Sequence, residues 1–446
     1  AVSNLMLEDS VIGRFLNGLR SMEQAELYET LEKDGMGLSD TGKLWDMEAA
    51  FAAMLAGNVV LFSDGLDFAL KIGSKGYPGS GVQKTDSEKG LRGSKEAFSE
   101  SVKMNTALIR KRIRNAKMKA EEKQVGRYSA TTTALLYLDG VVYLPICEEM
   151  RKRLDAFEVD GIEDSGMIEY LTRKKKEGRF PVYQTTERPD RAAQAILEGR
   201  VVLLTDNSPE ALIFPATLNS LFQTADDYYR NERIVTFLRL IRYVAAFLAL
   251  ALPGLYVAAA TFHPQLLPSN LIRSMAEARS GVPFPTAAEV LLMELSFELL
   301  REAGLRMPGP AGNTIGIVGG LIVGQAAVSA NLVSPITVTV AALTALGSFS
   351  IPNEELSEVF RLWKYGILLL GSCFGILGVM LGCFLLLMLM AEQESYGIPW
   401  LYPYVGGNLN ERADEKDSMF LAAARKRKRR PIFAKWGNRI RFRRKS

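Results

Sequence analysis

Residues 365–390 read YGILLLGSCFGILGVMLGCFLLLMLM, a run of 26 residues without a charged side chain. The hydrocarbon core of a bilayer is about 30 Å thick and is crossed by roughly 20 apolar residues of helix. A soluble core helix rarely stays uncharged for so long. The run therefore predicts a membrane-spanning segment.

Four more apolar runs precede this one. The first of them has the full length for a crossing, and the third and fourth come close to it. We therefore expect a polytopic α-helical membrane domain at residues 238–391. The four runs are Val244–Thr261, Ala287–Leu300, Ile315–Ala330 and Ile336–Ile351.

The overall composition conceals this division. Charged residues make up 23% of the chain and the mean hydropathy is only +0.05, because a polar half and an apolar half are averaged. From Leu421 onward there are 12 Lys or Arg and no acid, so this end carries +12 and the rest of the chain −8. We expect residues 392–446 to form a basic cytoplasmic tail.

The most basic part of the tail predicts a surface partner. Anionic lipid contributes about 1 kcal/mol per basic residue near a membrane, whereas nucleic acid is the other polyanion that such a run attracts. Because the neighbouring segment is apolar, we expect anionic lipid and no nucleic acid. The residues are Arg425, Lys426, Arg427, Lys428, Arg429 and Arg430.

The polar half, residues 1–237, predicts an α+β region of two small lobes, 1–125 and 126–237. Apolar residues at helical spacing predict helices, and short β-branched runs bounded by turn residues predict strands. The predicted helices are Val11–Leu31, Phe98–Lys119, Ile146–Phe157, Glu163–Lys176 and Arg191–Glu198. The predicted strands are Gly57–Phe62, Phe68–Leu70, Thr133–Leu138, Val201–Asp206 and Ala211–Phe214, the last two as a pair.

The distribution of basic residues predicts the topology. An excess of Lys and Arg marks the cytoplasmic side, and the first residues lack the charged and apolar pattern of a secretory signal. With both ends cytoplasmic, the number of crossings must be even. We expect four crossings, with the acid-bearing segment 287–304 re-entrant, interfacial or packed inside a bundle, because charges at a membrane centre are costly.

Catalytic patterns are scarce. The one histidine, His263, cannot form a cluster, and three scattered cysteines (Cys147, Cys373 and Cys383) do not make a disulfide framework. His263 either senses a proton or ligand at the outer face or simply caps a helix end. We expect no catalytic, cofactor or metal site, and thus no enzyme.

One face of the third apolar run is made of small residues. Such a face either lets neighbouring helices pack closely or lines a narrow pore shared by several copies of the chain. These positions are therefore candidates for lining a pore. They are Gly316, Gly320, Val323, Ala327, Ala330 and Val333.

A stripe of acids forms the second candidate. Glu289, Glu294 and Glu298 lie in the second apolar run, and carboxylates within a membrane often mark an ion pathway. Alternatively, Arg301 and Arg306 neutralise them.

Several short motifs follow one another in a specific order along the chain. They are Thr186–Asp190, Leu197–Val201, Asp226–Tyr229, Arg239–Tyr243, Leu252–Ala258, Thr261–Pro264, Gly281–Pro285, Glu298–Arg306, Val323–Val328, Leu332–Pro335 and Ser395–Pro399. Taken in this order, they resemble the A subunits of GerA-type spore germinant receptors over roughly residues 90–403. Residues 92–98, RGSKEAF, depart from the Arg-Gly-Pro-Arg-x-Gly-Phe run usual in that family.

The resemblance implies a function. Such A subunits lie in the inner membrane of dormant spores together with a transporter-like B subunit and a lipoprotein C subunit. They are thought to oligomerise into a ring that conducts cations and starts germination. The alternative is a scaffold that transmits a signal without conducting.

Overall fold

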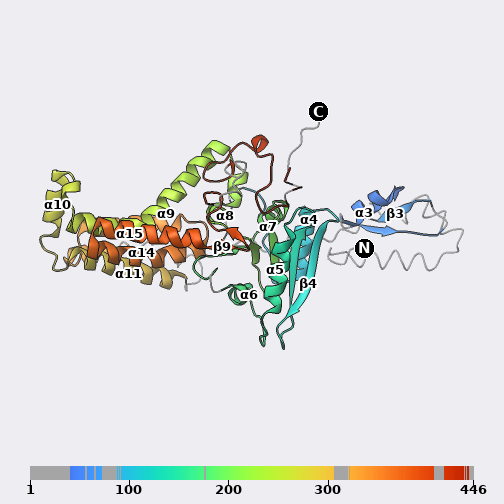
Figure 1. Ribbon diagram of the computed structural model, residues 1–446, viewed down its shortest axis with the longest axis horizontal. Helices are drawn as coiled ribbons and strands as arrows, with labels where there is room; N and C mark the ends of the chain where they lie inside the picture. The colour runs from blue at the N-terminus through green and yellow to red at the C-terminus, as the bar shows by residue number, and fades with distance from the viewer. Residues whose placement is uncertain are drawn as a thin grey trace.

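The computed structural model (Figure 1) describes most of the chain. The predicted helix Val11–Leu31 lies outside the described residues. These are 41–55, 58–64, 67–72, 88, 90, 92–174, 177–305, 320, 322–405, 416–435, 437 and 439–440.

A five-stranded antiparallel sheet forms the centre of the N-terminal region, with strand order β4-β5-β7-β8-β6. The predicted pairing of 201–206 with 211–214 is confirmed by the β7–β8 ladder. Side chains alternate between two cores, so that Leu203 enters one and Leu204 the other. The strands are β4 Met118–Val125, β5 Thr131–Leu138, β6 Gln184–Thr186, β7 Val201–Thr205 and β8 Ala211–Phe214.

Helices cover both faces of the sheet, as expected for an α+β region. On one face lie α4 (Val102–Arg112) and α7 (Pro189–Leu197), and on the other α5 (Leu144–Asp155) and α6 (Ser165–Thr172). Each presents an apolar stripe to the sheet, which removes that surface from water.

The predicted helix Phe98–Lys119 is confirmed only over Val102–Arg112. Helix α4 ends at Arg112, and Met118–Val125 forms strand β4, which pairs with β5 along its full length. Its sequence MKAEEKQV contains good helix formers, but pairing with the buried strand β5 outweighs that preference. The β4–β5 hairpin also joins residues on both sides of the lobe boundary expected at residue 125.

A smaller three-stranded sheet precedes the central one, with order β1-β3-β2. The two predicted strands pair antiparallel as β2 and β3. The elements are β1 Thr41–Leu44, α3 Met47–Leu55, β2 Val59–Leu61 and β3 Ala69–Ile72.

The C-terminal region is helical and extends away from the sheet, with α10 at its far end (Figure 1). Residues 322–329 form a further helix. Within the described part of the chain, one helix, α9, is long and apolar enough to cross a membrane, and α13 and α15 are apolar but shorter. The elements are α8 Leu218–Phe222, η3 Ala225–Tyr228, α9 Glu232–Thr261, η4 Pro264–Leu266, α10 Ser269–Arg279, α11 Thr286–Leu305, α13 Pro335–Phe349, α14 Glu354–Phe374 and α15 Ile376–Glu392.

The sequence predicts one crossing for the 26-residue uncharged run. The structure instead places the bend of a helical hairpin within this run. Gly375 has φ +64° and ψ −144° and separates α14 from α15. A side chain at Gly382 would lie 2.9 Å from Ile367 Cγ1, so glycines also allow the two helices to approach closely. Counting apolar residues could not reveal this bend, because it depends on a backbone conformation that glycine adopts at little cost.

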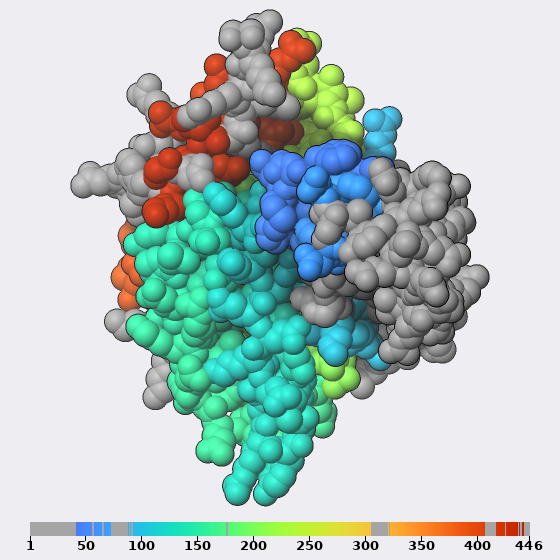
Figure 2. All heavy atoms as spheres, turned by 90° about the vertical axis from the view of Figure 1, so that its right-hand side faces the viewer, coloured from blue at the N-terminus to red at the C-terminus, as the bar shows by residue number. Residues whose placement is uncertain are grey.

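The C-terminal segment returns to the sheet. Strand β9 (Glu394–Ser395) pairs with β10 (Ile398–Pro399), and the Ser395 hydroxyl donates to the Val182 carbonyl at 3.0 Å. Trp400 is fully buried and donates its indole N–H to the Pro181 carbonyl at 2.7 Å. Figure 2 shows the red C-terminal residues lying against the blue-green sheet region. Helix α9 thus leaves, and α15 returns to, the same region, and the expected tail 392–446 packs in part against it.

The bend at Gly375 provides a test. Gly375→Ala should destabilise the protein by about 1–3 kcal/mol, because a side chain there is forced into a strained backbone conformation and would lie 2.9 Å from His263 Cε1. Gly366→Ala in the middle of α14 is the control, since nothing lies within 4 Å of its Cβ position. Thermal unfolding of the detergent-solubilised protein measures both, and equal midpoints would contradict the account.

Candidate functional site

The acids predicted on the second apolar run lie inside the helical region, on α11. Glu294 Oε2 is 2.6 Å from Lys364 Nζ of α14, and their side chains are only 2% and 5% exposed. Glu298 pairs with Arg361 at 2.8 Å and lies 3.4 Å from Lys364. The cations that pair with these two acids come from α14. Arg301, one of the two cations expected to neutralise the acids, lies 3.5 Å from Glu354 instead, and the other, Arg306, lies outside the described residues.

Glu289, at the other end of this stripe, links α11 to two further elements, α10 and α13. Its carboxylate pairs with Arg279 of α10 at 3.1 Å and accepts hydrogen bonds from the Ser334 backbone N–H at 2.9 Å and the Thr337 hydroxyl at 3.1 Å. Ser334 caps α13. The fully buried Glu289 therefore fixes the start of α13 against α11.

The charged cluster of α11 has two parts in a largely apolar set of helices: Glu289 with Arg279, and Glu294 and Glu298 with Lys364 and Arg361. Buried charges are tolerated when each has a partner. Helix α11 accordingly packs against α9 and α13, and its ion pairs join it to α14. The partners on α14 lie 63 and 70 residues further along the chain, so no local pattern in the sequence could identify them.

Most of the small-residue face packs against other helices of the same chain. Val333 is 1% exposed and packs with Met293 and Ala341, and Ala327 lies against the same cluster. A side chain at Gly320 would lie 3.4 Å from Phe297. Val323 is half-buried and Ala330 exposed, while Gly316 lies outside the described residues. These contacts favour the helix-packing alternative for most of this face.

Another face of the 322–329 helix is exposed. Ile322 is 60% exposed, and Gln325, Ala326 and Ser329 are exposed as well. These positions are three or four residues apart and so form one stripe. Gln325 and Ser329 place polar groups one turn apart on it. The stripe indicated by the sequence, with Val323, Ala327 and Ala330, lies beside this one.

A second charged cluster joins the sheet region to α9. The Asp227 carboxylate receives Arg239 Nε at 3.1 Å and Arg242 Nη1 at 2.9 Å. Arg239 also reaches Asp417 Oδ1 at 3.0 Å, and Arg427 reaches Asp417 Oδ2 at 3.1 Å. We call Asp227, Arg239, Arg242, Asp417 and Arg427 the junction cluster. It ties η3, the start of α9 and the C-terminal segment together.

Arginine contacts set the protonation of the Asp227 carboxyl group. Burial alone would raise the pKa of Asp227, but the hydrogen bond from Arg242 and the charges of Arg242 and Arg239 lower it overall. The carboxylate is therefore ionised at neutral pH, which keeps both arginines paired. In the sequence, Asp227, Arg239 and Arg242 stand out only as parts of the family motifs.

The basic run of the tail is divided in two. Arg427 belongs to the junction cluster, and Arg430 Nε donates to the Leu197 carbonyl at 2.8 Å. Arg425, Lys426, Lys428 and Arg429 are exposed. Arg427 and Arg430 are therefore held against the rest of the chain, and Arg425, Lys426 and Lys428 remain to meet a membrane surface.

Metal ligands do not gather in the described residues, where no three His, Cys, Asp or Glu side chains lie close enough to hold an ion.

The pair between α11 and α14 provides a test. Lys364→Met leaves Glu294 buried without its cation, and removing one partner of such a pair costs about 3–5 kcal/mol. The double variant Glu294→Leu with Lys364→Met removes both charges and should recover most of the loss. Thermal unfolding in detergent compares the two, and a double variant no more stable than the single one would refute the pairing.

Comparisons with known proteins identify relatives of this chain. Residues 1–433 match the family model described as Bacillus/Clostridium GerA spore germination protein. The chain is 36% identical to the membrane protein YfkQ of Bacillus subtilis over 94% of this chain and 80% of that one. It is 34% identical to spore germination protein KA of the same organism, over 90% and 74%, and 37% identical to its spore germination protein A1, over 79% and 73%.

A solved structure is also similar in part. It is the crystal structure of the N-terminal domain of the A subunit of the Bacillus megaterium spore germinant receptor GerK3. The match has a TM-score of 0.33 and 25% identity, and covers 45% of this chain and 72% of that chain.

Proposed function

This chain belongs to the GerA family of Bacillus/Clostridium spore germination proteins, and we propose that it is the A-type subunit of a germinant receptor whose helical region conducts cations. In this proposal several copies surround a common path through the membrane. The observation that carries it is the open polar stripe of the 322–329 helix beside a fully paired charged cluster.

The surface of the helical region supports its insertion in a membrane. Helix α15 exposes Leu377, Met380, Phe384 and Leu387 by 57–73%. Such a continuous apolar surface is rare on a soluble monomer and is typical of contact with lipid or a partner. Helix α14, with 21 residues, is about 31 Å long at 1.5 Å per residue, close to the thickness of a bilayer core.

The hairpin and the pairing of α11 change the proposed topology. Because the acids of α11 are paired within the chain, the cost of placing them in a membrane falls, and this helix joins the set that passes through. The helices α9, α11, α13, α14 and α15, together with the segment that includes the 322–329 helix, then make six passes. Six is even, so both ends remain on the cytoplasmic side of the inner spore membrane.

The polar stripe supports a conducting path. Gln325 and Ser329 would lose hydrogen bonds to water if they faced lipid. Around an axis shared by several copies, they would instead line an aqueous path, with Ile322 and Ala326 as its apolar neighbours. This replaces the small-residue face as the proposed lining.

A non-conducting scaffold is the second candidate. In its favour, Glu289, Glu294 and Glu298 all have cationic partners, so none of them is a free site for a moving ion. In either case we propose that the chain acts in a complex with a transporter-like B subunit and a lipoprotein C subunit.

Cysteine labelling tests the conducting path. In the complete receptor, Gln325→Cys and Ser329→Cys should react with a water-soluble, membrane-impermeant thiol reagent, and the modification should reduce ion flux at least several-fold. Phe384→Cys on the apolar surface of α15, which is 66% exposed, is the matched control and should not react. All three variants are made on a background with Cys147, Cys373 and Cys383 replaced by serine or alanine.

Two results would contradict the conducting path. Labelling of residue 384 as readily as residue 329 would remove the distinction between the two surfaces. Complete labelling of residue 329 without any effect on ion flux would favour the scaffold.

A further inference from the structure

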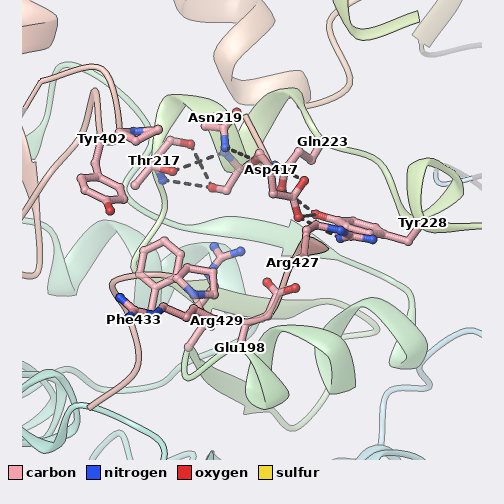
Figure 3. A pocket seen from close by; sticks show the side chains of 14 residues that line it. Glu198, Thr217, Asn219, Gln223, Tyr228, Tyr402, Asp417, Arg427, Arg429 and Phe433 are labelled. Carbon is pink, nitrogen blue, oxygen red and sulfur yellow. Dashed lines mark hydrogen bonds and ion pairs between the residues drawn. The ribbon is translucent and has the colours of Figure 1, made fainter. Parts of the chain in front are cut away.

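A small cavity lies beneath the C-terminal segment, next to the junction cluster. It has a volume of about 60 Å³, which corresponds to roughly four or five water-sized positions. Its walls come from three parts of the chain: the start of β7, helix α8 and the C-terminal segment. Figure 3 shows Thr217 and Asn219 on one side, Glu198 and Phe433 on the other, and Arg427 between them.

Arg200, in the wall of the cavity, forms no ion pair with an acid among the described residues. Its side chain donates Nε to the Pro215 carbonyl at 2.9 Å and Nη1 to Gln184 Oε1 at 2.7 Å. Nη2 has no hydrogen-bond partner in the described structure, although Arg200 is only 5% exposed. Burial lowers the pKa of Arg200 to about 10, so the group is still a cation at neutral pH. A buried cation of this kind is costly unless an anion joins it.

Two more guanidinium groups line the same cavity. Arg427 uses Nη1 for Asp417, but its Nε is buried without a partner among the described residues. Arg429 lines the cavity from the same segment. The opposing carboxylates are Glu198, which accepts from Gln194 at 3.1 Å, and Asp417, which is shared with Arg239 outside the cavity. Three cations and two partly engaged acids leave an excess of positive charge.

The type and number of donors point to an oxyanion. Guanidinium groups bind carboxylate and phosphate through directed, charge-assisted hydrogen bonds. Three guanidinium groups, one from the sheet region and two from the C-terminal segment, suit a tetrahedral group with several acceptor oxygens better than a planar carboxylate, which two donors satisfy. A phosphate group, with five heavy atoms, also matches the volume.

We propose that this cavity binds one phosphate group, which fastens the C-terminal segment to the sheet region. Arg200 belongs to the sheet region, whereas Arg427 and Arg429 belong to the segment, so a phosphate between them bridges the two. Asp417 of this segment pairs with Arg239 of α9 at 3.0 Å, so the bridge also bears on the first long helix. The phosphate comes either from solution or from a lipid headgroup.

Calorimetric titration of the detergent-solubilised full chain with inorganic phosphate tests the proposal. Binding should saturate at one phosphate per chain, and Arg427→Gln should weaken it at least tenfold. Arg425→Gln is the matched control, because Arg425 is exposed in the same basic run and does not line the cavity; it should bind as the unchanged protein does. Equal weakening by both variants, or no saturable binding, would overturn the proposal.

Competition in the unchanged protein avoids any effect of substitution on folding. Sulfate, which is tetrahedral, should displace phosphate, and acetate should do so at least tenfold less well. Equal displacement by acetate would overturn the tetrahedral site. Short-chain phosphatidic acid distinguishes the source: tighter binding than inorganic phosphate at the same site indicates a lipid headgroup, and weaker binding indicates phosphate from solution.

Discussion

The ion pair between Glu294 and Lys364 is the contact on which the helical region depends. Its atoms lie 2.6 Å apart, and both side chains are almost completely buried. Without Lys364, Glu294 would be a buried acid without a cation, which is strongly destabilising. With it, α11 is joined to α14, while α9 packs against α11, α13, α14 and α15. The acids thus serve first to hold the helices together.

The junction cluster connects this region to the rest of the chain. Asp227 binds two arginines of α9, and Asp417 brings the C-terminal segment to the same point. Because α15 leads directly into that segment, the first and last long helices are both anchored to the sheet region. A displacement of the sheet region would therefore reach both helices, which is what a receptor subunit needs in order to pass on a signal.

Part of the fold follows from local sequence. The apolar runs of β5, β7 and β8 predict strands because they are buried on both faces, and α5 and α7 follow from helical spacing. Strand β4 does not follow, because its residues favour a helix and only the neighbouring strand decides otherwise. The hairpin at Gly375 was also missed, since its cause is a positive φ and not a change in hydrophobicity.

The candidate site, like the fold, could be predicted from the sequence only in part. The acids of α11 were identified by their position in an apolar run, but their partners on α14 depend on the tertiary fold. The small residues were recognised as a packing or lining face, and the burial of Val333 favours packing within the chain. The open stripe with Gln325 and Ser329 emerges only once that packing is known.

The central claim is that several copies of this chain surround one path, with the 322–329 helices facing a common axis. Native mass spectrometry of the detergent-solubilised assembly tests this most directly, since each copy contributes 49.2 kDa. The account predicts three or more copies in a single assembly. An assembly that contains one copy, alone or with other subunits, would contradict it.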